Sequence, residues 1–324
     1  MTFWISEDNV AGKPGKALFI ILPTVGCYRF RIGKACYMCS YPAAAPKKKW
    51  SQEAIVDYVR QALKKIKGKK GPFAVRMFTS GSFLDNGELK PETRRRIFEI
   101  LAKMDNVEEV VIESRSELVR YDAVRELAEI VPDRHFEVAI GLETANDDIA
   151  DVSINKGNTF KDFIRAAEIT HKAGAKVKTY LLLKPIFMSE RNGMEDVKES
   201  IVRAEPYTDT FSINITDIQK GTLYERLWEK GEYRPPWLWS AIEVLIWAKK
   251  RFPDKRILSD PVGAGSKRGP HNCLTDYDRV IGRAIKRFSA TQELGYIINL
   301  HHECRKEWLF VIQENLLDWQ LIMW

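Results

Sequence analysis

Three cysteines near the N-terminus form the clearest metal-binding pattern in the chain. Eight residues separate Cys27 from Cys36, and two residues separate Cys36 from Cys39. They are three of only five cysteines in 324 residues, so the clustering does not follow from abundance. Three thiolates can bind three irons of a four-iron, four-sulfur cluster and leave the fourth iron without a protein ligand. The spacing therefore predicts a [4Fe-4S] cluster with one iron open to a small molecule.

A structural zinc site is the main alternative for the same thiols. Such a site normally takes four protein ligands, and no fourth Cys or His lies nearby in the sequence. His135 or a histidine near the C-terminus could supply the fourth ligand only through the fold. The local pattern therefore favours the iron–sulfur cluster.

Cysteine and histidine also occur together near the C-terminus. His271-Asn272-Cys273 and His301-His302-Glu303-Cys304 contain residue types that could hold a second metal. The interpretation we favour is a pair of buried thiols with surface histidines. Because His271 follows Lys267 and Arg268, it is instead a candidate for contacting a phosphate or moving a proton.

Six short apolar, β-branched runs alternate with segments of helical period. The runs are residues 17–23, 74–79, 107–113, 136–143, 177–183 and 210–216, and the helical segments are 52–67, 91–104, 121–131, 159–173 and 194–204. Alternation of this kind indicates parallel strands joined by right-handed helical crossovers. We predict an α/β fold, a partial (β/α)6 TIM-like barrel, although a doubly wound open sheet fits the same pattern.

The alternation of strand and helix patterns ends at about residue 220. Helical segments at 223–229, 239–251 and 276–288 are separated by Gly231, by Pro235-Pro236 and by a glycine- and proline-rich loop at 261–270. We therefore divide the chain into a barrel with the cysteine loop, residues 1–220, and a mostly helical extension, residues 221–324, that faces the substrate.

Polar residues recur where the predicted strands end, which is the edge at which parallel barrels bind ligands. They are Ser80, Gly81 and Ser82 after the second strand, Glu113 and Arg115 after the third, and Glu143 and Thr144 after the fourth, while the fifth strand carries Lys178. An ordinary turn, helix N-cap partners and a local ion pair are the alternatives for these residues. Their convergence on one edge favours a binding site.

The net charge of +7 is unevenly distributed. Lys47, Lys48 and Lys49 follow the cysteine loop, and further basic runs lie at 64–70 and 94–96. Such a surface attracts a polyanion, although solvated lysine-rich helix ends, as in thermophilic proteins, are the alternative. No apolar run is long enough to span a bilayer, and the first fifteen residues lack the order of a signal peptide. We expect a cytoplasmic protein with no membrane partner.

The Cys-x8-Cys-x2-Cys pattern resembles the radical S-adenosylmethionine (SAM) superfamily, in particular its Elp3-like branch. Longer stretches resemble one family of that branch, the radical SAM enzymes for archaeosine formation (RaSEA, the archaeosine synthase β subunits). They are residues 24–42, 78–85, 113–115, 141–146, 153–157, 180–185, 219–223, 233–239 and 265–273. The similarity runs from about Trp4 to the final helix. Ser40 stands where the family pattern has glycine, and Asp276 where it has a further cysteine.

This resemblance implies roles for the residues above. Cys27, Cys36 and Cys39 would bind iron, with Tyr37 and Met38 beside the cluster and SAM. Ser80, Gly81 and Ser82 would bind the methionine part of SAM, and Glu113, Arg115, Glu143 and Thr144 its ribose and carboxylate. Lys178 and His271 are the candidate catalytic residues. Lys47, Lys48, Lys49, Lys267 and Arg268 are the candidates for contacting tRNA or the substrate.

The resemblance also implies a reaction. A partner subunit of archaeosine synthase attaches lysine to a 7-deazaguanine at position 15 of tRNA, and the radical SAM subunit cleaves the lysine carbon–nitrogen bond to leave archaeosine. An electron donor is required. Another radical SAM modification of tRNA, such as methylthiolation or carboxymethylation, is the alternative within enzymes. A zinc-stabilised RNA-binding protein without catalysis and a radical SAM enzyme for small molecules also fit the residues.

Overall fold

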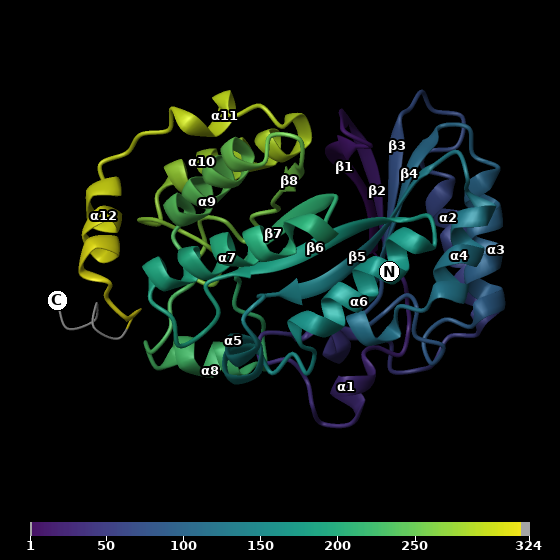
Figure 1. Cartoon of the computed structure of the whole chain (residues 1–324), viewed down its shortest axis with the longest axis horizontal. Helices are drawn as coiled ribbons and strands as arrows, with labels where there is room; N and C mark the ends of the chain where they lie inside the picture. The colour runs from purple at the N-terminus through teal and green to yellow at the C-terminus, as the bar shows by residue number, and fades with distance from the viewer. Residues whose placement is uncertain (1, 319–324) are drawn as a thin grey trace.

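The computed structural model describes residues 2–318, and its centre is one curled sheet of eight strands that follow one another in chain order (Figure 1). Its strands are β1 (Thr2–Val10), β2 (Lys13–Ile21), β3 (Phe73–Phe78), β4 (Val107–Ser114), β5 (His135–Glu143), β6 (Lys176–Leu183), β7 (Thr210–Ile215) and β8 (Arg256–Leu258). β1 pairs antiparallel with β2, and all other neighbours are parallel. The predicted partial TIM-like barrel is confirmed, because the sheet curls without pairing β1 to β8.

Helices connect the parallel strands and cover the outer face of the sheet (Figure 1). The crossovers are α2 (Gln52–Leu63), α3 (Pro91–Ala102), α4 (Tyr121–Ile130), α6 (Phe160–Lys172), α7 (Glu190–Ala204) and α9 (Leu238–Arg251). Several begin at residues that satisfy their free N–H groups. Ser51 and Ser189 accept from the third residue of α2 and α7, and Thr159 forms a reciprocal capping box with Asp162 at α6. These caps fix where the helices begin, and the crossovers coincide with the segments of helical period in the sequence.

The remaining helices and turns complete the chain. They are α1 (Tyr28–Arg31), η1 (Tyr41–Ala44), η2 (Ser116–Leu118), α5 (Asp147–Ile149), η3 (Ala150–Ile154), η4 (Glu205–Tyr207), α8 (Leu223–Glu229), α10 (Asp276–Thr291), α11 (Gly295–Ile298) and α12 (Arg305–Glu314). α12 packs against α7 and α9 at the end of the molecule far from β2 to β4 (Figure 1).

Two strands, β1 and β8, were missing from the six-strand prediction. β1 contains the polar run Ser6-Glu7-Asp8-Asn9, which hides its apolar alternation. β8 has only three residues, too few to show a period, and it lies in the segment expected to be mostly helical. Its pairing with β7 extends the barrel sheet beyond residue 220.

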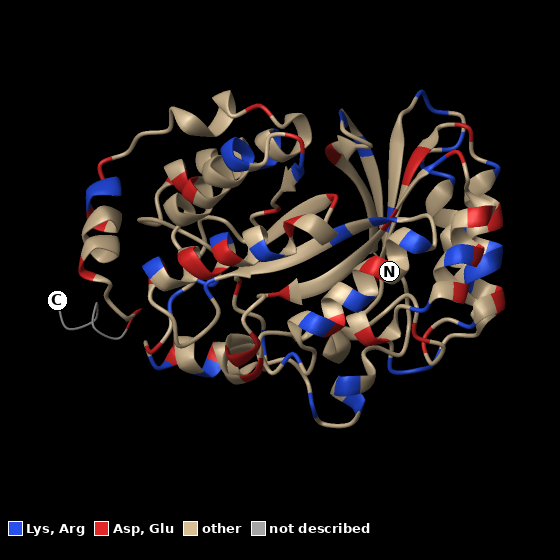
Figure 2. Cartoon of the chain, viewed as in Figure 1, with Lys and Arg blue, Asp and Glu red and all other residues tan. Residues whose placement is uncertain are grey.

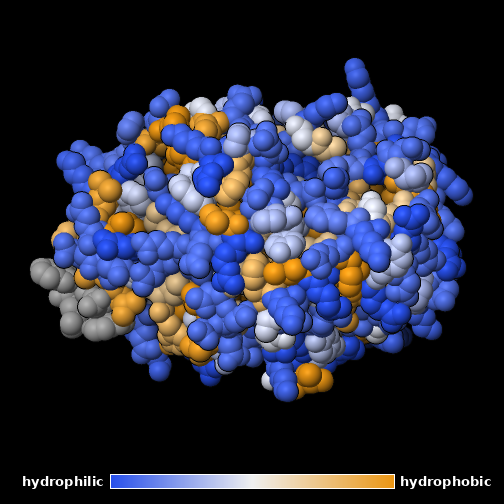
Figure 3. Space-filling model, in the orientation of Figure 1, coloured by the Kyte–Doolittle hydropathy of each residue, from blue (hydrophilic) through white to orange (hydrophobic). Residues whose placement is uncertain are grey.

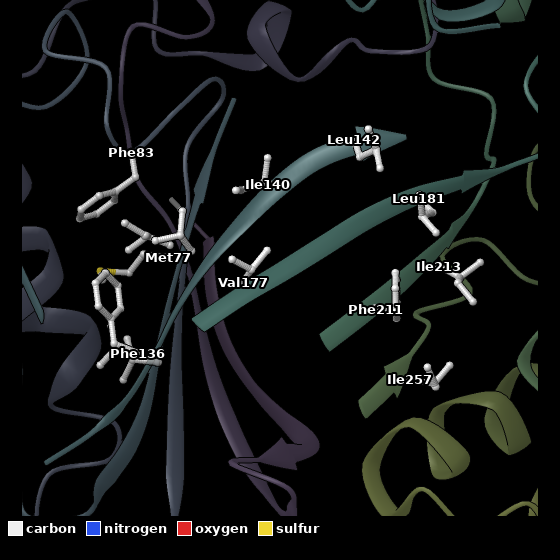
Figure 4. Packing of buried hydrophobic residues seen from close by; sticks show 14 of the residues in the cluster. Met77, Phe83, Phe136, Ile140, Leu142, Val177, Leu181, Phe211, Ile213 and Ile257 are labelled. Carbon is white, nitrogen blue, oxygen red and sulfur yellow. The ribbon is translucent and has the colours of Figure 1, made fainter. Parts of the chain in front are cut away.

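The two faces of the sheet have opposite character because side chains alternate along each strand. Residues such as Met77, Phe136, Ile140, Val177 and Phe211 form the buried hydrophobic cluster between the sheet and its helices (Figure 4). The alternate positions on the inner face are polar, and include Arg76, Glu109, Glu113, Glu137, Lys178, Tyr180, Thr210 and Arg256. The outer face therefore stabilises the barrel by hydrophobic burial, and the inner face is available for chemistry.

A buried charge network closes the interior near the N-terminal ends of the strands. Glu109 is fully buried and contacts Arg76 at 3.3 Å and Arg256 at 2.7 Å. Arg256 also pairs with the fully buried Glu137 at 2.6 Å, and Arg76 with Asp8 at 2.5 Å. Buried charges remain stable only when each has a partner. The network ties β1, β3, β4, β5 and β8 together.

The surface carries mixed charges. On α3, three consecutive arginines, residues 94–96, lie between Glu92 and Glu99, and α1 carries Arg29 and Arg31 (Figure 2). The face shown in Figure 3 is mostly hydrophilic, with small and separated hydrophobic areas. Within residues 2–318, every helix is too short or too polar to traverse a bilayer.

We predict that Glu109→Ala destabilises the protein strongly, because it leaves Arg76 and Arg256 buried without their shared carboxylate. Breaking such a network by removing one partner costs about 3–5 kcal/mol. Glu108→Ala is the matched control, since Glu108 lies next to it on β4 and is exposed. Chemical denaturation of the two variants should separate them clearly, and equal midpoints would contradict the assigned network.

Candidate active site at the strand ends

The cysteine loop leaves the C-terminal end of β2 and is attached to neighbouring strand ends. Cys27 directly precedes α1, and its N–H donates to the carbonyl of Ser80 beyond β3 at 3.0 Å. The N–H of Cys39 donates to the carbonyl of Cys36 at 3.2 Å. Burial raises the pKa of the Cys39 thiol to about 12, and Cys36 and Cys27 act on it in the same direction. The three thiols therefore share one region at the open edge of the barrel.

Gly81 is required for the loop to approach β3 this closely. A methyl group added at Gly81 would lie 2.6 Å from Cα and 2.7 Å from N of Cys27, and would overlap the carboxylate of Glu88. These separations are shorter than any real contact of a methyl carbon. The glycine in the Thr79–Ser82 turn thus permits contact between the turn and the backbone of the first cysteine.

Glu88 is a positioning residue that the sequence did not reveal. Its buried carboxylate accepts from the N–H of Ser82 at 2.6 Å and from the hydroxyl of Thr24 at 2.5 Å. Burial raises the pKa of Glu88, although both hydrogen bonds oppose that shift. Glu88 thereby joins the turn after β3 to the start of the cysteine loop. It lies in a polar turn without periodicity, so no pattern singled it out.

Arg115 holds the loop from the opposite side. Its Nη1 lies 3.9 Å from Sγ of Cys36, and its Nη2 donates to the carbonyl of Lys156 at 2.6 Å and to the side chain of Asn158. Its Nε donates to Glu117 at 2.5 Å. The Nε and Nη2 atoms of the guanidinium are therefore bonded within the protein, and its Nη1 brings positive charge close to the thiol of Cys36.

Residues 153–157 form a second support for the loop. The Asn155 side chain donates to the carbonyl of Ala35 at 2.8 Å, and the carbonyl of Ile154 accepts from the N–H of Tyr37 at 2.8 Å. Asn155 adopts a left-handed φ of 55°. Gly157 is also left-handed, at 69°, and any side chain there would overlap the guanidinium of Arg29. The stretch carried the family resemblance, but only the fold shows what it contacts.

Carboxylates and amines line the inner face beside the loop. Lys156 pairs with Glu143 at 2.8 Å, and both are at most a tenth exposed. Burial raises the pKa of Glu113 to about 7, although a hydrogen bond from Tyr180 and the charge of Lys178 oppose the shift. The site thus contains one compensated carboxylate and one that exchanges protons near neutral pH.

Other predicted residues lie at the same edge in different environments. Tyr37 and Met38 pack against a hydrophobic cluster that includes Ile186, Ile218 and Tyr224, away from the main core. The hydroxyl of Thr144 is buried and donates to Asp196 of α7 at 2.7 Å. It therefore connects β5 to a covering helix and is already engaged.

Of the two candidate catalytic residues, Lys178 acts electrostatically on Glu113 of this group, whereas His271 lies in a separate cavity. Lys178 lies near the start of β6, and burial lowers its pKa to about 8, with Arg76 acting in the same direction. His271 is buried, with Nδ1 2.7 Å from the carbonyl oxygen of Gly269, and burial lowers its pKa to about 4. It lines a separate cavity of about 690 Å³ with Arg234, Cys273 and residues of α12.

The residues predicted to contact nucleic acid differ in exposure and in whether they already have an ion-pair partner. Lys47, Lys48, Lys49 and Lys267 are exposed. Arg268 pairs with Glu225 at 2.6 Å and lies over the Trp228 ring at 4.9 Å, which ties the 261–270 loop to α8. The three lysines after the cysteine loop remain available to a ligand at the strand ends.

The histidines do not support the zinc alternative for Cys27, Cys36 and Cys39. His135 lies 3.2 Å from Glu137, His171 lies 2.7 Å from Asp209, and His302 lies 3.0 Å from Sγ of Cys304. His271 faces Gly269, and the backbone of the exposed His301 bonds Tyr277. None of these contacts reaches the cysteine loop, so no histidine among the described residues supplies a fourth ligand to the three thiols.

We predict that Gly81→Ala destabilises the protein by about 1–3 kcal/mol, the usual effect of forcing atoms into a packed site. Gly295→Ala is the control, because nothing lies within 4 Å of a methyl group there and the backbone is not left-handed. Thermal denaturation measures both. A Gly81→Ala melting temperature equal to that of the control would show that the loop does not pack on the turn.

Comparison with known proteins agrees with this geometry. The model of the radical SAM superfamily matches residues 21–197, more than half of the chain. Archaeosine synthase subunit beta of Thermococcus kodakarensis is 83% identical over the full length of both chains. The protein of the same description from Methanosarcina acetivorans is 45% identical over 96% of this chain and 89% of that one.

Solved structures share the fold at low sequence identity. Methylornithine synthase (PylB) has a TM-score of 0.56 at 15% identity, over 74% of this chain and 63% of that one. Elp3 of Methanocaldococcus infernus has a TM-score of 0.54 at 14% identity, over 83% of this chain and 63% of that one. The chain belongs to the radical SAM superfamily, whose enzymes use a [4Fe-4S] cluster and S-adenosylmethionine, and within it to the archaeosine synthase β subunits.

Proposed function

We propose that this enzyme cleaves the lysine carbon–nitrogen bond of a lysine-bearing 7-deazaguanine at position 15 of tRNA and thereby forms archaeosine. The observation that carries the proposal is the 83% identity, over the full length, to a protein described as archaeosine synthase subunit beta. That description also implies a partner subunit, which on our proposal attaches the lysine. An electron donor completes the system.

Cys27, Cys36 and Cys39 are the proposed ligands of the cluster. Their loop is fixed by Ser80, Asn155 and Arg115, and no histidine among the described residues competes for the fourth iron. Arg115 lies beside Cys36 and Lys156 acts electrostatically on Cys39, so both bring positive charge toward ligands that bind as thiolates. The bound cluster and SAM together supply a 5′-deoxyadenosyl radical, and the protein positions and shields it.

The strand ends next to the loop are the proposed SAM site. The Thr79–Ser82 turn lies against Cys27 and is the proposed contact for the methionine part, while Glu113 and Glu143 on the inner face are the proposed partners of the ribose and amino groups. Arg115 and Thr144 act through positioning, because their polar atoms already bond other residues. Tyr37 and Met38 shield one side with their hydrophobic cluster.

The open edge suits an RNA substrate. Lys47, Lys48 and Lys49 are exposed beside the loop. Three aromatic side chains near the same edge are also exposed: Phe30 on α1 at 39%, Tyr41 at 60% and Phe187 after β6 at 60%. Lysines attract the phosphate backbone, and exposed rings can stack with bases that leave the RNA helix. This combination favours tRNA over a free small molecule as the substrate.

We predict that Cys36→Ala removes the reductive cleavage of SAM while leaving the fold intact. Anaerobically reconstituted protein should lose its iron and produce less than about a hundredth of the wild-type 5′-deoxyadenosine, because the cluster then lacks one of its three ligands. Lys34→Ala, an exposed neighbour on the loop, is the control. Continued 5′-deoxyadenosine production by Cys36→Ala would refute the ligand assignment.

We also predict that reversing the charges of Lys47, Lys48 and Lys49 weakens tRNA binding more at low than at high salt. Each lost phosphate contact should reduce the salt slope by about one unit. The matched control reverses the exposed Lys64, Lys67 and Lys69, which follow α2 at the opposite end of the barrel. Equal losses in both triple variants would exclude a specific tRNA contact at the cysteine loop.

The decisive experiment for the reaction uses reduced, reconstituted protein with SAM and tRNA carrying the lysine adduct, without oxygen. Digestion and mass spectrometry should show archaeosine replacing the adduct. Persistence of the adduct while 5′-deoxyadenosine accumulates would count against carbon–nitrogen cleavage. A methylthio or carboxymethyl product would identify a different modification of tRNA.

A further inference from the structure

Outside the active site, two cysteines and a histidine from distant parts of the sequence converge. Cys273 lies in the loop before α10, whereas His302 and Cys304 lie in the turn before α12. Their ligand atoms are all within 4.8 Å of one another. Nδ1 of His302 lies 3.0 Å from Sγ of Cys304 and 3.8 Å from Sγ of Cys273. From the sequence we favoured unrelated thiols and surface histidines, and the fold instead brings three of them together.

These separations agree with the dimensions of a tetrahedral zinc site. Zinc–sulfur and zinc–nitrogen bonds of about 2.3 Å and 2.0 Å at tetrahedral angles place sulfur and nitrogen ligands about 3.5 Å apart. The two sulfur–nitrogen distances in the structure, 3.0 Å and 3.8 Å, lie on either side of that value. Thiolate and imidazole together are ligands that zinc prefers. We propose that Cys273, His302 and Cys304 bind one structural zinc ion.

The surroundings of the three ligands support the proposal. The indole Nε1 of Trp239, which lies beside Cys304, has no hydrogen-bond partner among the described residues and is free to donate to a bound thiolate. The ring of His302 stacks on Tyr277 at a centroid distance of 5.0 Å, which fixes its orientation. Asp278 is fully buried and interacts electrostatically with both His302 and Cys304. Its Oδ1 has no hydrogen-bond partner among the described residues, and on our proposal water completes the fourth position of the ion.

The proposed zinc ion has a structural task in this fold. It joins the loop before α10 to the start of α12, where Trp308 already donates to Ser240 of α9 at 2.8 Å. Beyond α12, Asp318 pairs at 2.7 Å with the buried Lys184 at the C-terminal end of β6. Zinc at the start of α12 therefore helps to hold the C-terminal segment against the edge of the barrel. It binds separately from the cluster and does not take part in catalysis.

The test measures zinc and iron together in full-length protein reconstituted under reducing conditions with both metals supplied. Wild-type protein should contain about one zinc per chain, and His302→Gln and Cys304→Ser should reduce that content at least tenfold while keeping iron and 5′-deoxyadenosine production. His301→Gln is the matched control, because His301 is the exposed neighbour of His302 and should keep its zinc. Wild-type protein without zinc, or zinc unchanged in His302→Gln, overturns the proposal.

Cobalt provides a second measurement that is independent of the iron cluster and of any folding defect in one variant. Adding Co²⁺ to metal-free wild-type protein and to a variant with Cys27, Cys36 and Cys39 all replaced by alanine should produce the visible absorption of a four-coordinate thiolate site in both. Cys273→Ser should abolish that absorption. Absorption that disappears with the three loop cysteines but survives Cys273→Ser assigns the metal to the cluster loop and overturns the proposal.

Discussion

The structure depends on contact between the cysteine loop and the turn after β3. Backbone meets backbone where the N–H of Cys27 donates to Ser80, and the missing side chain of Gly81 makes that approach possible. A flexible loop carrying three thiols would incur a large entropy loss on binding a cluster. Attaching the loop to rigid strand ends moves that entropy loss into folding, which pre-organises the loop for binding.

The cysteine loop is attached to the neighbouring strand ends mainly through hydrogen bonds of polar side chains. Glu88 binds the turn, Arg115 binds the second cysteine's side of the loop, and Asn155 binds the backbone of Ala35. Buried polar groups are stable only when they are satisfied, and here they satisfy one another across four strand ends. The same contacts leave the guanidinium of Arg115 and the hydroxyl of Thr144 engaged, whereas Glu113 retains a pKa near neutrality.

The barrel provides this rigid edge by separating two kinds of stabilisation. Hydrophobic burial on the outer face holds helices against strands, as around Met77 and Phe136 (Figure 4). The inner face is polar, and the ion pairs of Glu109 and Arg256 close the barrel near the N-terminal ends of its strands. Lys178 lies near that closed end, which explains why a lysine on a barrel strand does not by itself mark the catalytic edge. Depth along the strand decides the environment of each inward-facing side chain.

The sequence by itself determined the six central strands, the helices between them and the position of the cysteine loop, because periodicity and cysteine spacing are local properties of the chain. It also carried the resemblance to the family, through short stretches at the strand ends. Only the tertiary structure decided that β1 and β8 join the sheet, that Glu88 and Gly157 support the loop, and that Cys273 meets His302. Those relations join residues far apart in the chain, and packing in three dimensions alone selects which distant groups become neighbours.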